Sequence, residues 1–270
     1  MKGDYSTNAG LLAPPPRKTN TDSTSSSDQA ERIRQLEEEN KALKGRVEQL
    51  SQFARSAAHD LKEPLRMIAS YTTLLERTLG TELDPRAADF LEQISSSAQR
   101  AYALLDSMLQ YAALSYREIT LTDVDLNEVL RQVLANLQLR IRESGAHIEA
   151  GPLPVVHANA ELMVQVFQNL LSNAIKFTPP DRRPHIQIRS TELPAAWQIE
   201  VADNGIGIPA DQLEKIFEAF ERGHAGRNYE GTGLGLAITQ RILERLGGTI
   251  RVASEEGAGS TFILTLPKQA

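Results

Sequence analysis

The feature that most constrains the fold is a regular heptad pattern near the N-terminus, in which every position but one is apolar. Spacings of three and four residues alternate through Ile33, Leu36, Asn40, Leu43, Val47, Leu50, Ala54, Ala57 and Leu61. Such a pattern is typical of a left-handed coiled coil. Asn40 occupies an a position, where a polar residue costs stability but favours one register. The alternative is a single amphipathic helix packed on its own domain, but so narrow a seam favours a partner helix and a parallel dimer.

The seam changes register after Leu61. The next apolar positions follow two successive four-residue steps, a stutter that locally unwinds a supercoil: Leu65, Ile68, Thr72, Leu75 and Leu79. Pro64 lies inside the stutter and removes a backbone hydrogen bond, so we expect a kink there. His59 falls at an f position, which faces away from the seam. The sequence therefore predicts an exposed histidine beside a weakened helical turn.

A second helix is expected after a loop marked by Gly80 and Asp84-Pro85. It should run from about Pro85 to Ser115 and has its own seam: Ala87, Leu91, Ile94, Ala98, Ala101, Leu105, Met108 and Ala112. A single hairpin could not bury both seams. Two copies can do so in an antiparallel four-helix bundle, so we expect a homodimer.

After Tyr116 the pattern changes to mixed α/β. Helices are predicted at 127–144, at 160–177 and from about Gly233, and strands at 119–126, 185–189, 196–202, 249–253 and 261–266. This order indicates an α/β sandwich, with helices on one face of a mixed sheet. Four segments follow: a Ser- and Pro-rich tail or linker at 1–28 that we expect to be disordered, a coiled-coil helix at 29–54, a dimerisation domain at 55–117 and the α/β domain at 118–270.

Composition excludes several classes of protein. The chain has no Cys, so it has no disulfide framework and fits a reducing compartment. A net charge of −6 argues against nucleic acid as the main partner. The sequence shows neither an apolar run of about 20 residues, which a membrane-spanning helix needs, nor a secretory signal. We therefore expect a soluble, cytoplasmic protein.

Five short motifs follow one another along the chain: His59-Asp60-x-x-x-Pro64, Asn169-x-x-x-Asn173-x-x-Lys176, Asp203-x-Gly205-x-Gly207, Phe217-x-x-Phe220 and Gly231-x-Gly233-x-Gly235. In this order and at these separations they resemble the H, N, G1, F and G2 boxes of two-component sensor histidine kinases. The string from His59 to Pro64 resembles the phytochrome-linked kinases in particular. The resemblance covers roughly residues 30 to 268. It implies ATP and Mg²⁺ as ligands, and a Bergerat (GHKL) fold for the α/β domain.

Asn169, Asn173 and Lys176 recur on one face of a predicted helix. By the resemblance, Asn173 supplies an oxygen to Mg²⁺ and Lys176 places a cation near the ATP phosphates. The alternative is a polar stripe that faces solvent, but the apolar neighbours of these residues indicate a half-buried helix. In the hydrolysing relatives the position of Asn169 is usually Glu, the base that activates water. Asn has no basic site, which favours a kinase over a simple ATPase.

Asp203 lies at the end of a predicted strand and opens a Gly-rich turn. By the resemblance its carboxylate accepts the exocyclic amine of adenine, and Gly205 and Gly207 let the backbone pass close to the base. By the resemblance, Thr261 matches a threonine that often lies near the same adenine in relatives. The alternative is an ordinary turn, since Asp-Asn-Gly is a strong turn signal.

Gly231, Gly233 and Gly235 precede and open a helix, whose free amide groups attract phosphate oxygens. A dinucleotide-binding fingerprint needs another spacing and a preceding strand. Phe217 and Phe220 resemble the apolar hinge of a mobile ATP lid. Four residues could reach ATP from that lid, although each could equally be solvated: Arg222, His224, Arg227 and Tyr229.

Among the histidines, His59 alone combines a predicted exposed helix face with an adjacent carboxylate. His147, His157 and His185 lie in or beside predicted strands without catalytic neighbours, and His224 falls in the lid. By the resemblance His59 is the phosphoacceptor. Asp60 can accept the proton or hydrogen bond of its second ring nitrogen.

The resemblance implies autophosphorylation of His59 and transfer of the phosphoryl group to an Asp of a response regulator. Glu63 stands where kinases that dephosphorylate their regulators commonly carry Thr or Asn, so we expect weak phosphatase activity. Input would come from an upstream sensory domain or protein through the coiled coil. Two other functions stay open: an ATP-binding interaction or phosphotransfer module with little turnover, and a GHKL-type ATPase.

Overall fold

The computed structural model describes residues 22–80, 84–114, 118–221 and 231–268. The chain divides into two compact units, residues 1–47 and 48–270. Helix α1 (Asp22–Leu79) begins in the first unit and ends in the second. Residues 22–28 are therefore helical, which corrects the prediction of disorder for that part of segment 1–28. Extending an established helix costs little, because each added residue gains a backbone hydrogen bond.

The predicted seam of α1 is exposed in the single chain. In the first unit, Ile33 and Leu43 are 56% and 60% exposed, and Leu36 and Val47 are also exposed. In the second unit the same holds for Leu61, Ile68, Leu75 and Leu79. Helix α1 continues through Pro64 without a break, so the expected kink stays a prediction. A continuous apolar stripe on a long helix is the pattern expected where a partner helix covers it.

The predicted loop and second helix are confirmed. Gly80 follows α1 with a φ of +49°, which favours glycine. Asp84 caps α2 (Pro85–Ala113): its carboxylate accepts the N–H of Arg86 at 2.8 Å, and Pro85 occupies the first helical position. An ion pair between Lys62 and Asp106 joins the two helices.

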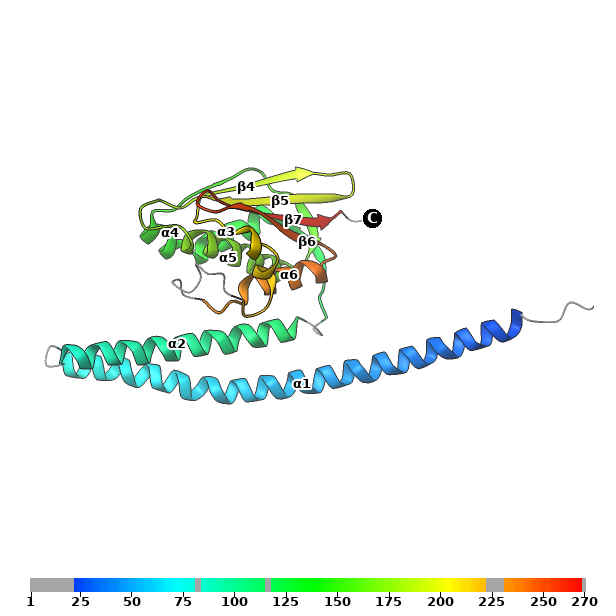
Figure 1. Cartoon of the computed structure of the whole chain (residues 1–270), viewed down its shortest axis with the longest axis horizontal. Helices are drawn as coiled ribbons and strands as arrows, with labels where there is room; N and C mark the ends of the chain where they lie inside the picture. The colour runs from blue at the N-terminus through cyan, green and yellow to red at the C-terminus, as the bar shows by residue number, and fades with distance from the viewer. Residues whose placement is uncertain (1–21, 81–83, 115–117, 222–230, 269–270) are drawn as a thin grey trace, which may run out of the picture. The chain divides into compact units, whose positions relative to one another are not determined.

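The C-terminal part of the chain is built on a five-stranded mixed sheet with the order β2-β4-β5-β7-β6 (Figure 1). Its strands are β2 (His147–Ala150), β4 (His185–Glu192), β5 (Ala196–Asp203), β6 (Thr249–Glu255) and β7 (Gly259–Pro267). Strand β2 runs parallel to β4, and the other neighbouring pairs are antiparallel. Two short strands, β1 (Thr122–Asp125) and β3 (Val155–Ala158), form a separate antiparallel pair.

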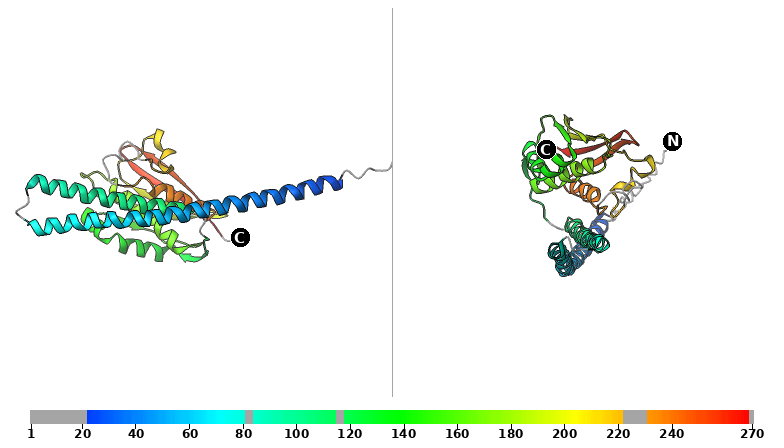
Figure 2. Two further views of the ribbon diagram at one scale, coloured as in Figure 1. Left: turned by 90° about the horizontal axis from the view of Figure 1, so that it is seen from below. Right: turned by 90° about the vertical axis from the view of Figure 1, so that its left-hand side faces the viewer.

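Four helices lie on one side of this sheet (Figures 1 and 2): α3 (Leu126–Asn136), α4 (Gln138–Ser144), α5 (Ala160–Lys176) and α6 (Gly235–Arg245). Alternate residues of the strands face them and are buried, because successive side chains of a strand point to opposite faces. The sheet contributes Ile186, Ile188, Ile199, Val201, Ile250, Phe262, Leu264 and Leu266 to this core, and α5 contributes Met163, Val166, Phe167, Leu170 and Leu171. This is the predicted α/β sandwich.

Two predicted boundaries are wrong. The expected helix 127–144 is two helices, α3 and α4, which meet at Leu137. Leu137 is buried and has φ −94° and ψ 4°. Leucine favours helices, so helix propensity does not account for the break. The expected strand 119–126 is confined to β1, which begins at Thr122 and ends where Asp125 caps α3 by accepting the N–H of Asn127 at 2.8 Å. The predicted stop of α4 at Gly145 is confirmed by its φ of +65°.

No helix in the described part of the chain is both long enough and apolar enough to cross a bilayer.

Candidate nucleotide and phosphoacceptor site

Helix α5 carries the first group of predicted site residues. Asn159 caps it by accepting the N–H of Leu162 at 3.1 Å, and its apolar side is buried in the core. Asn169, Asn173 and Lys176 are half-buried on another side of the same helix. They are therefore not a stripe that faces solvent, and the prediction of a half-buried helix is confirmed.

Asn169 joins α5 to α6. Its side-chain Nδ2 donates to the carbonyl oxygen of Gly235 at 3.0 Å and to Oγ1 of Thr239 at 3.3 Å. The Thr239 hydroxyl itself donates to the same carbonyl at 2.9 Å and is fully buried. Asn169 thus lies against the Gly-rich start of α6, and it carries no carboxylate that could act as a base.

Asn173 and Lys176 lie one and two turns further along α5. The side-chain amide of Asn173 forms no hydrogen bond with any residue that the structure describes. A half-buried amide of this kind is well suited to an external ligand. The ammonium of Lys176 is 4.0 Å from the ring centroid of Phe177. A Cβ placed on Gly231 would lie 2.9 Å from the same ammonium nitrogen. The lysine therefore reaches the Gly-rich segment that precedes α6.

Asp203 ends β5 and points to the helical side of the sheet. Its Oδ1 accepts the N–H groups of Gly205 at 2.9 Å and Ser260 at 3.2 Å. Both bonds fall on one oxygen, so Oδ2 has no hydrogen-bond partner among the described residues. Burial raises the pKa of the Asp203 carboxyl, and the two backbone hydrogen bonds act in the opposite direction.

Gly205 and Gly207, which follow Asp203, are required because neighbouring backbone atoms lie too close to leave room for a Cβ. A Cβ on Gly205 would lie 2.8 Å from the carbonyl oxygen of Phe177, and one on Gly207 would lie 2.0 Å from that of Glu255. Gly207 also has a φ of +70°. The turn is therefore built for glycine at both positions, as the resemblance implies.

The register of β5 and β7 favours Ser260 over Thr261 as the β7 residue beside Asp203. Asp203 pairs with Ser260, whereas Thr261 pairs with Ala202. Since successive residues of a strand point to opposite faces, the side chain of Thr261 lies on the face away from Asp203. The sequence pattern could not distinguish these two neighbours.

The Gly-rich motif opens α6 as predicted. Gly231 and Gly233 have φ values of +154° and +72°, and Gly235 is the first residue of the helix. Among the described residues no side chain caps this N-terminus, so its first amide groups are open to an external acceptor. An anion such as a phosphate is the ligand that this arrangement favours.

The two phenylalanines before this motif differ in their surroundings. Phe217 ends the short 3-10 helix η3 (Lys215–Phe217) and packs against the core. Phe220 is exposed, has a φ of +69°, and its N–H donates to the carbonyl oxygen of Gly233 at 3.1 Å. The predicted lid residues Arg222, His224, Arg227 and Tyr229 lie outside the described residues.

The predicted phosphoacceptor lies in α1. The helical backbone includes His59 and Asp60, and Asp60 is exposed, whereas the side chain of His59 lies outside the described residues. Glu63, the position that predicts weak phosphatase activity, is also exposed.

Three supporting residues were not predicted. Thr239 holds the start of α6, as described above. Arg182 donates to the carbonyl oxygens of Asn204 at 3.2 Å and Gly257 at 3.0 Å, which ties the turn after Asp203 to the β6–β7 turn. Ser254 accepts the N–H of Ile208 at 2.8 Å. None of them belongs to a short motif, and their roles follow only from tertiary contacts.

Comparison with known proteins identifies both parts of the chain. Residues 158–270 match the family described as "Histidine kinase-, DNA gyrase B-, and HSP90-like ATPase". Residues 49–117 match the family described as "His Kinase A (phospho-acceptor) domain". The second match contains His59, and the first contains Asn169, Asp203 and the Gly-rich motif.

The chain is also similar to individual proteins. It is 42% identical over 238 residues to the phytochrome-like protein Cph1 of Synechocystis sp., covering 88% of this chain and 31% of that relative. The chain thus spans less than a third of the length of this relative. Full-length ShkA in complex with AMPPNP superposes with a TM-score of 0.63 at 28% identity, covering 81% of this chain and 46% of ShkA.

A second solved structure is the histidine kinase ThkA in complex with the response regulator protein TrrA. Its TM-score is 0.56 at 25% identity, and the match covers 81% of this chain and 61% of ThkA. A helical phosphoacceptor region followed by a GHKL-type α/β domain is therefore common to this chain and its relatives. The chain belongs to the two-component histidine kinases, as a phosphoacceptor domain joined to an ATPase domain of the histidine kinase, gyrase and HSP90 type.

Proposed function

We propose that this chain is an ATP-dependent protein-histidine kinase that phosphorylates His59 and passes the phosphoryl group to an Asp of a response regulator. The observation that carries the proposal is the setting of Asn169. Its side-chain amide donates to Gly235 and Thr239, beside the N-terminus of α6 that favours phosphate. In the hydrolysing relatives the position of Asn169 is usually a basic Glu. A site without that base keeps ATP for transfer to another acceptor.

Each part of the nucleotide would have a distinct partner. Oδ2 of Asp203 would accept a hydrogen bond from the exocyclic amine of adenine, since Oδ1 already accepts hydrogen bonds from two backbone N–H groups. The open amide groups at the start of α6 would bind phosphate oxygens, and Lys176 would add a positive charge next to them. The half-buried side-chain amide of Asn173 fits a single protein ligand to Mg²⁺. When bound, the ion would neutralise charge on the phosphates.

The transfer step uses His59 and Asp60. A ring nitrogen of His59 attacks the γ-phosphorus, and the bond from that phosphorus to the bridging oxygen of ADP breaks. Asp60 accepts a hydrogen bond from the other ring nitrogen, which orients the imidazole and stabilises the positive charge that it acquires. The phosphoryl group then moves from His59 to a carboxylate oxygen of the regulator Asp, and the imidazole is restored.

We propose a homodimer for this kinase, with the exposed seams of α1 and α2 covered by the second copy as a coiled coil and a four-helix bundle. A response regulator is the proposed acceptor, because ThkA forms a complex with one. Input from a sensory domain or protein before the coiled coil fits a chain that spans 31% of its phytochrome-like relative. We place this reaction in the cytoplasm, which suits a chain without cysteine that uses ATP.

The test is incubation with γ-labelled ATP and Mg²⁺, comparing the unaltered protein with His59→Gln. We expect acid-labile, alkali-stable label that is absent from the variant. His157→Gln is the matched control, because it removes a histidine of the α/β domain and should leave the label unchanged. ATP binding without label would favour the interaction-module alternative. Steady phosphate release without label would favour the ATPase alternative.

A further inference from the structure

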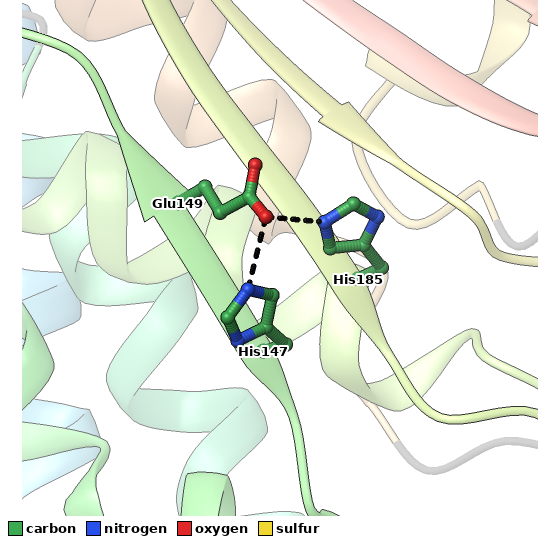
Figure 3. Close-up of side chains that lie close together, drawn as sticks. All are labelled: His147, Glu149 and His185. Carbon is green, nitrogen blue, oxygen red and sulfur yellow. Dashed lines mark hydrogen bonds and ion pairs between the residues drawn. The ribbon is translucent and has the colours of Figure 1, made fainter.

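Two histidines and a glutamate meet at the edge of the five-stranded sheet (Figure 3). The parallel register of β2 and β4 pairs His147 with His185 and Glu149 with Gln187. Paired residues of neighbouring strands, and residues two apart in one strand, point to the same face. The register therefore brings His147, Glu149 and His185 together, although they come from separate parts of the sequence.

The three side chains converge on one carboxylate oxygen. Oε1 of Glu149 lies 2.9 Å from Nε2 of His147 and 3.3 Å from Nε2 of His185. The two imidazole rings are stacked, with centroids 5.4 Å apart and planes inclined by 20°. All three potential ligand atoms lie within 4.8 Å of one another.

This spacing fits a small metal ion. Ligand atoms about 2.0–2.1 Å from a tetrahedral Zn²⁺ are about 3.3–3.4 Å from one another. The two nitrogen–oxygen separations, 2.9 and 3.3 Å, differ from this value by at most a few tenths of an ångström. The two imidazole nitrogens lie no more than 4.8 Å apart, and rotation of the histidine side chains would bring them to the tetrahedral spacing. Two imidazoles and a carboxylate suit Zn²⁺ and neighbouring transition metals, whereas Mg²⁺ and Ca²⁺ prefer oxygen ligands alone.

Neighbouring residues hold the carboxylate in place. Nε2 of Gln187 donates to Oε2 of Glu149 at 3.2 Å, and Arg189 donates to Oε1 of Gln187 at 3.0 Å. Hydrogen bonds of this kind orient metal ligands in proteins. One oxygen of Glu149 is thus fixed by Gln187, while the other faces both imidazoles.

The cluster is separate from the nucleotide site. Ile186, between His185 and Gln187, is buried on the helical face and pairs with Asp203. By strand alternation, His185 lies on the opposite face of the sheet, and its side chain is 41% exposed. The cluster is therefore open to solvent and accessible to an ion.

We propose that His147, Glu149 and His185 form a binding site for a divalent transition-metal ion, preferentially Zn²⁺, with solvent completing its coordination. The ion would join the four-residue edge strand β2 to β4 by side-chain ligands, in addition to the backbone register. An exposed strand edge is otherwise held only by its ladder on one side.

The test is calorimetric titration of the full chain with Zn²⁺, after removal of bound metal by a chelator and of any polyhistidine tag. We expect His147→Ala, His185→Ala and Glu149→Gln each to weaken binding by roughly tenfold or more, since each removes one ligand. Excess Mg²⁺ should not compete. Co²⁺ titration gives a second readout, because its visible absorption reports a tetrahedral site with nitrogen ligands, and the same variants should lose that absorption.

His157→Ala is the matched control. His157 also lies in a strand and contacts a carboxylate, with Nδ1 3.2 Å from Oδ1 of Asp123, but that pair is not part of the three-ligand cluster. Its removal should leave Zn²⁺ affinity unchanged. Circular dichroism should show that all variants are folded. Absence of binding, or equal affinity in the three cluster variants and the unaltered protein, would overturn the proposal and leave two imidazoles that hydrogen-bond one carboxylate.

Discussion

Gly257, in the turn between β6 and β7, and Gly259, the first residue of β7, allow the effect of close packing around Asp203 to be measured. Gly257 and Gly259 both have positive φ values, +84° and +120°. A Cβ on Gly257 would meet nothing within 4 Å, whereas one on Gly259 would lie 2.1 Å from the carbonyl oxygen of Asp203 and 2.9 Å from its carbonyl carbon. Alanine at the two positions therefore separates backbone strain from a clash at Asp203.

The expected costs follow from this geometry. Gly257→Ala should lower the free energy of unfolding by about 1–2 kcal/mol, the cost of a positive φ for an L-residue. Gly259→Ala incurs at least the same strain, and the clash with backbone atoms adds about 1–3 kcal/mol, as for overpacked cores. For a domain of this size, 1 kcal/mol corresponds to about 2–4 °C in the midpoint of thermal unfolding. We expect Gly259→Ala to melt at least a few degrees below Gly257→Ala.

The two variants should also differ in ATP affinity. Relief of the clash at Gly259 must move the Asp203 backbone, and with it the carboxylate oxygen proposed to accept the adenine amine. We expect the dissociation constant for ATP to rise by roughly tenfold or more in Gly259→Ala, equivalent to about 1.4 kcal/mol, and to change little in Gly257→Ala. Thermal unfolding of the full chain and calorimetric titration with an ATP analogue measure the two effects. Equal melting points and affinities for both variants would refute the reasoning.

Four further outcomes are expected. Asn159→Ala should cost at least about 1 kcal/mol in thermal unfolding, since it removes the N-cap of α5 and the hydrogen bond to the carbonyl oxygen of Thr120, while Asn159→Asp should keep the cap, lose only the second bond and be the more stable of the two. Asn169→Glu should raise phosphate release and reduce label on the protein, because it restores a base but removes the amide that donates to Gly235; unchanged release would contradict this. Leu43→Glu should shift the chain toward monomer in analytical ultracentrifugation, with Glu38→Gln, at an exposed f position that faces away from the seam, as control. Glu63→Thr should increase dephosphorylation of the cognate regulator, and no change would remove the explanation offered for weak phosphatase activity.

Helical features were predictable from the sequence because the helical period is regular. Asn169, Asn173 and Lys176 could be assigned to one face of α5 from their spacing, and to a half-buried helix from their apolar neighbours, and the structure places them there. The end of α4 at Gly145 was equally predictable from the residue type. The break at Leu137 was not, because leucine favours helices and its residue type gives no stop signal.

Features that depend on the pairing of strands could not be predicted from the sequence. The choice between Ser260 and Thr261 beside Asp203 rests on the register of β5 and β7, and a shift of one residue would reverse it. The same applies to His147 and His185, which the sequence places beside strands without functional neighbours. Their proximity arises only because β2 is parallel to β4 and in register with it. A site on one helix can be recognised from the regular spacing of its residues in the sequence, whereas a site that bridges two strands can be recognised only when the register of the strands is known.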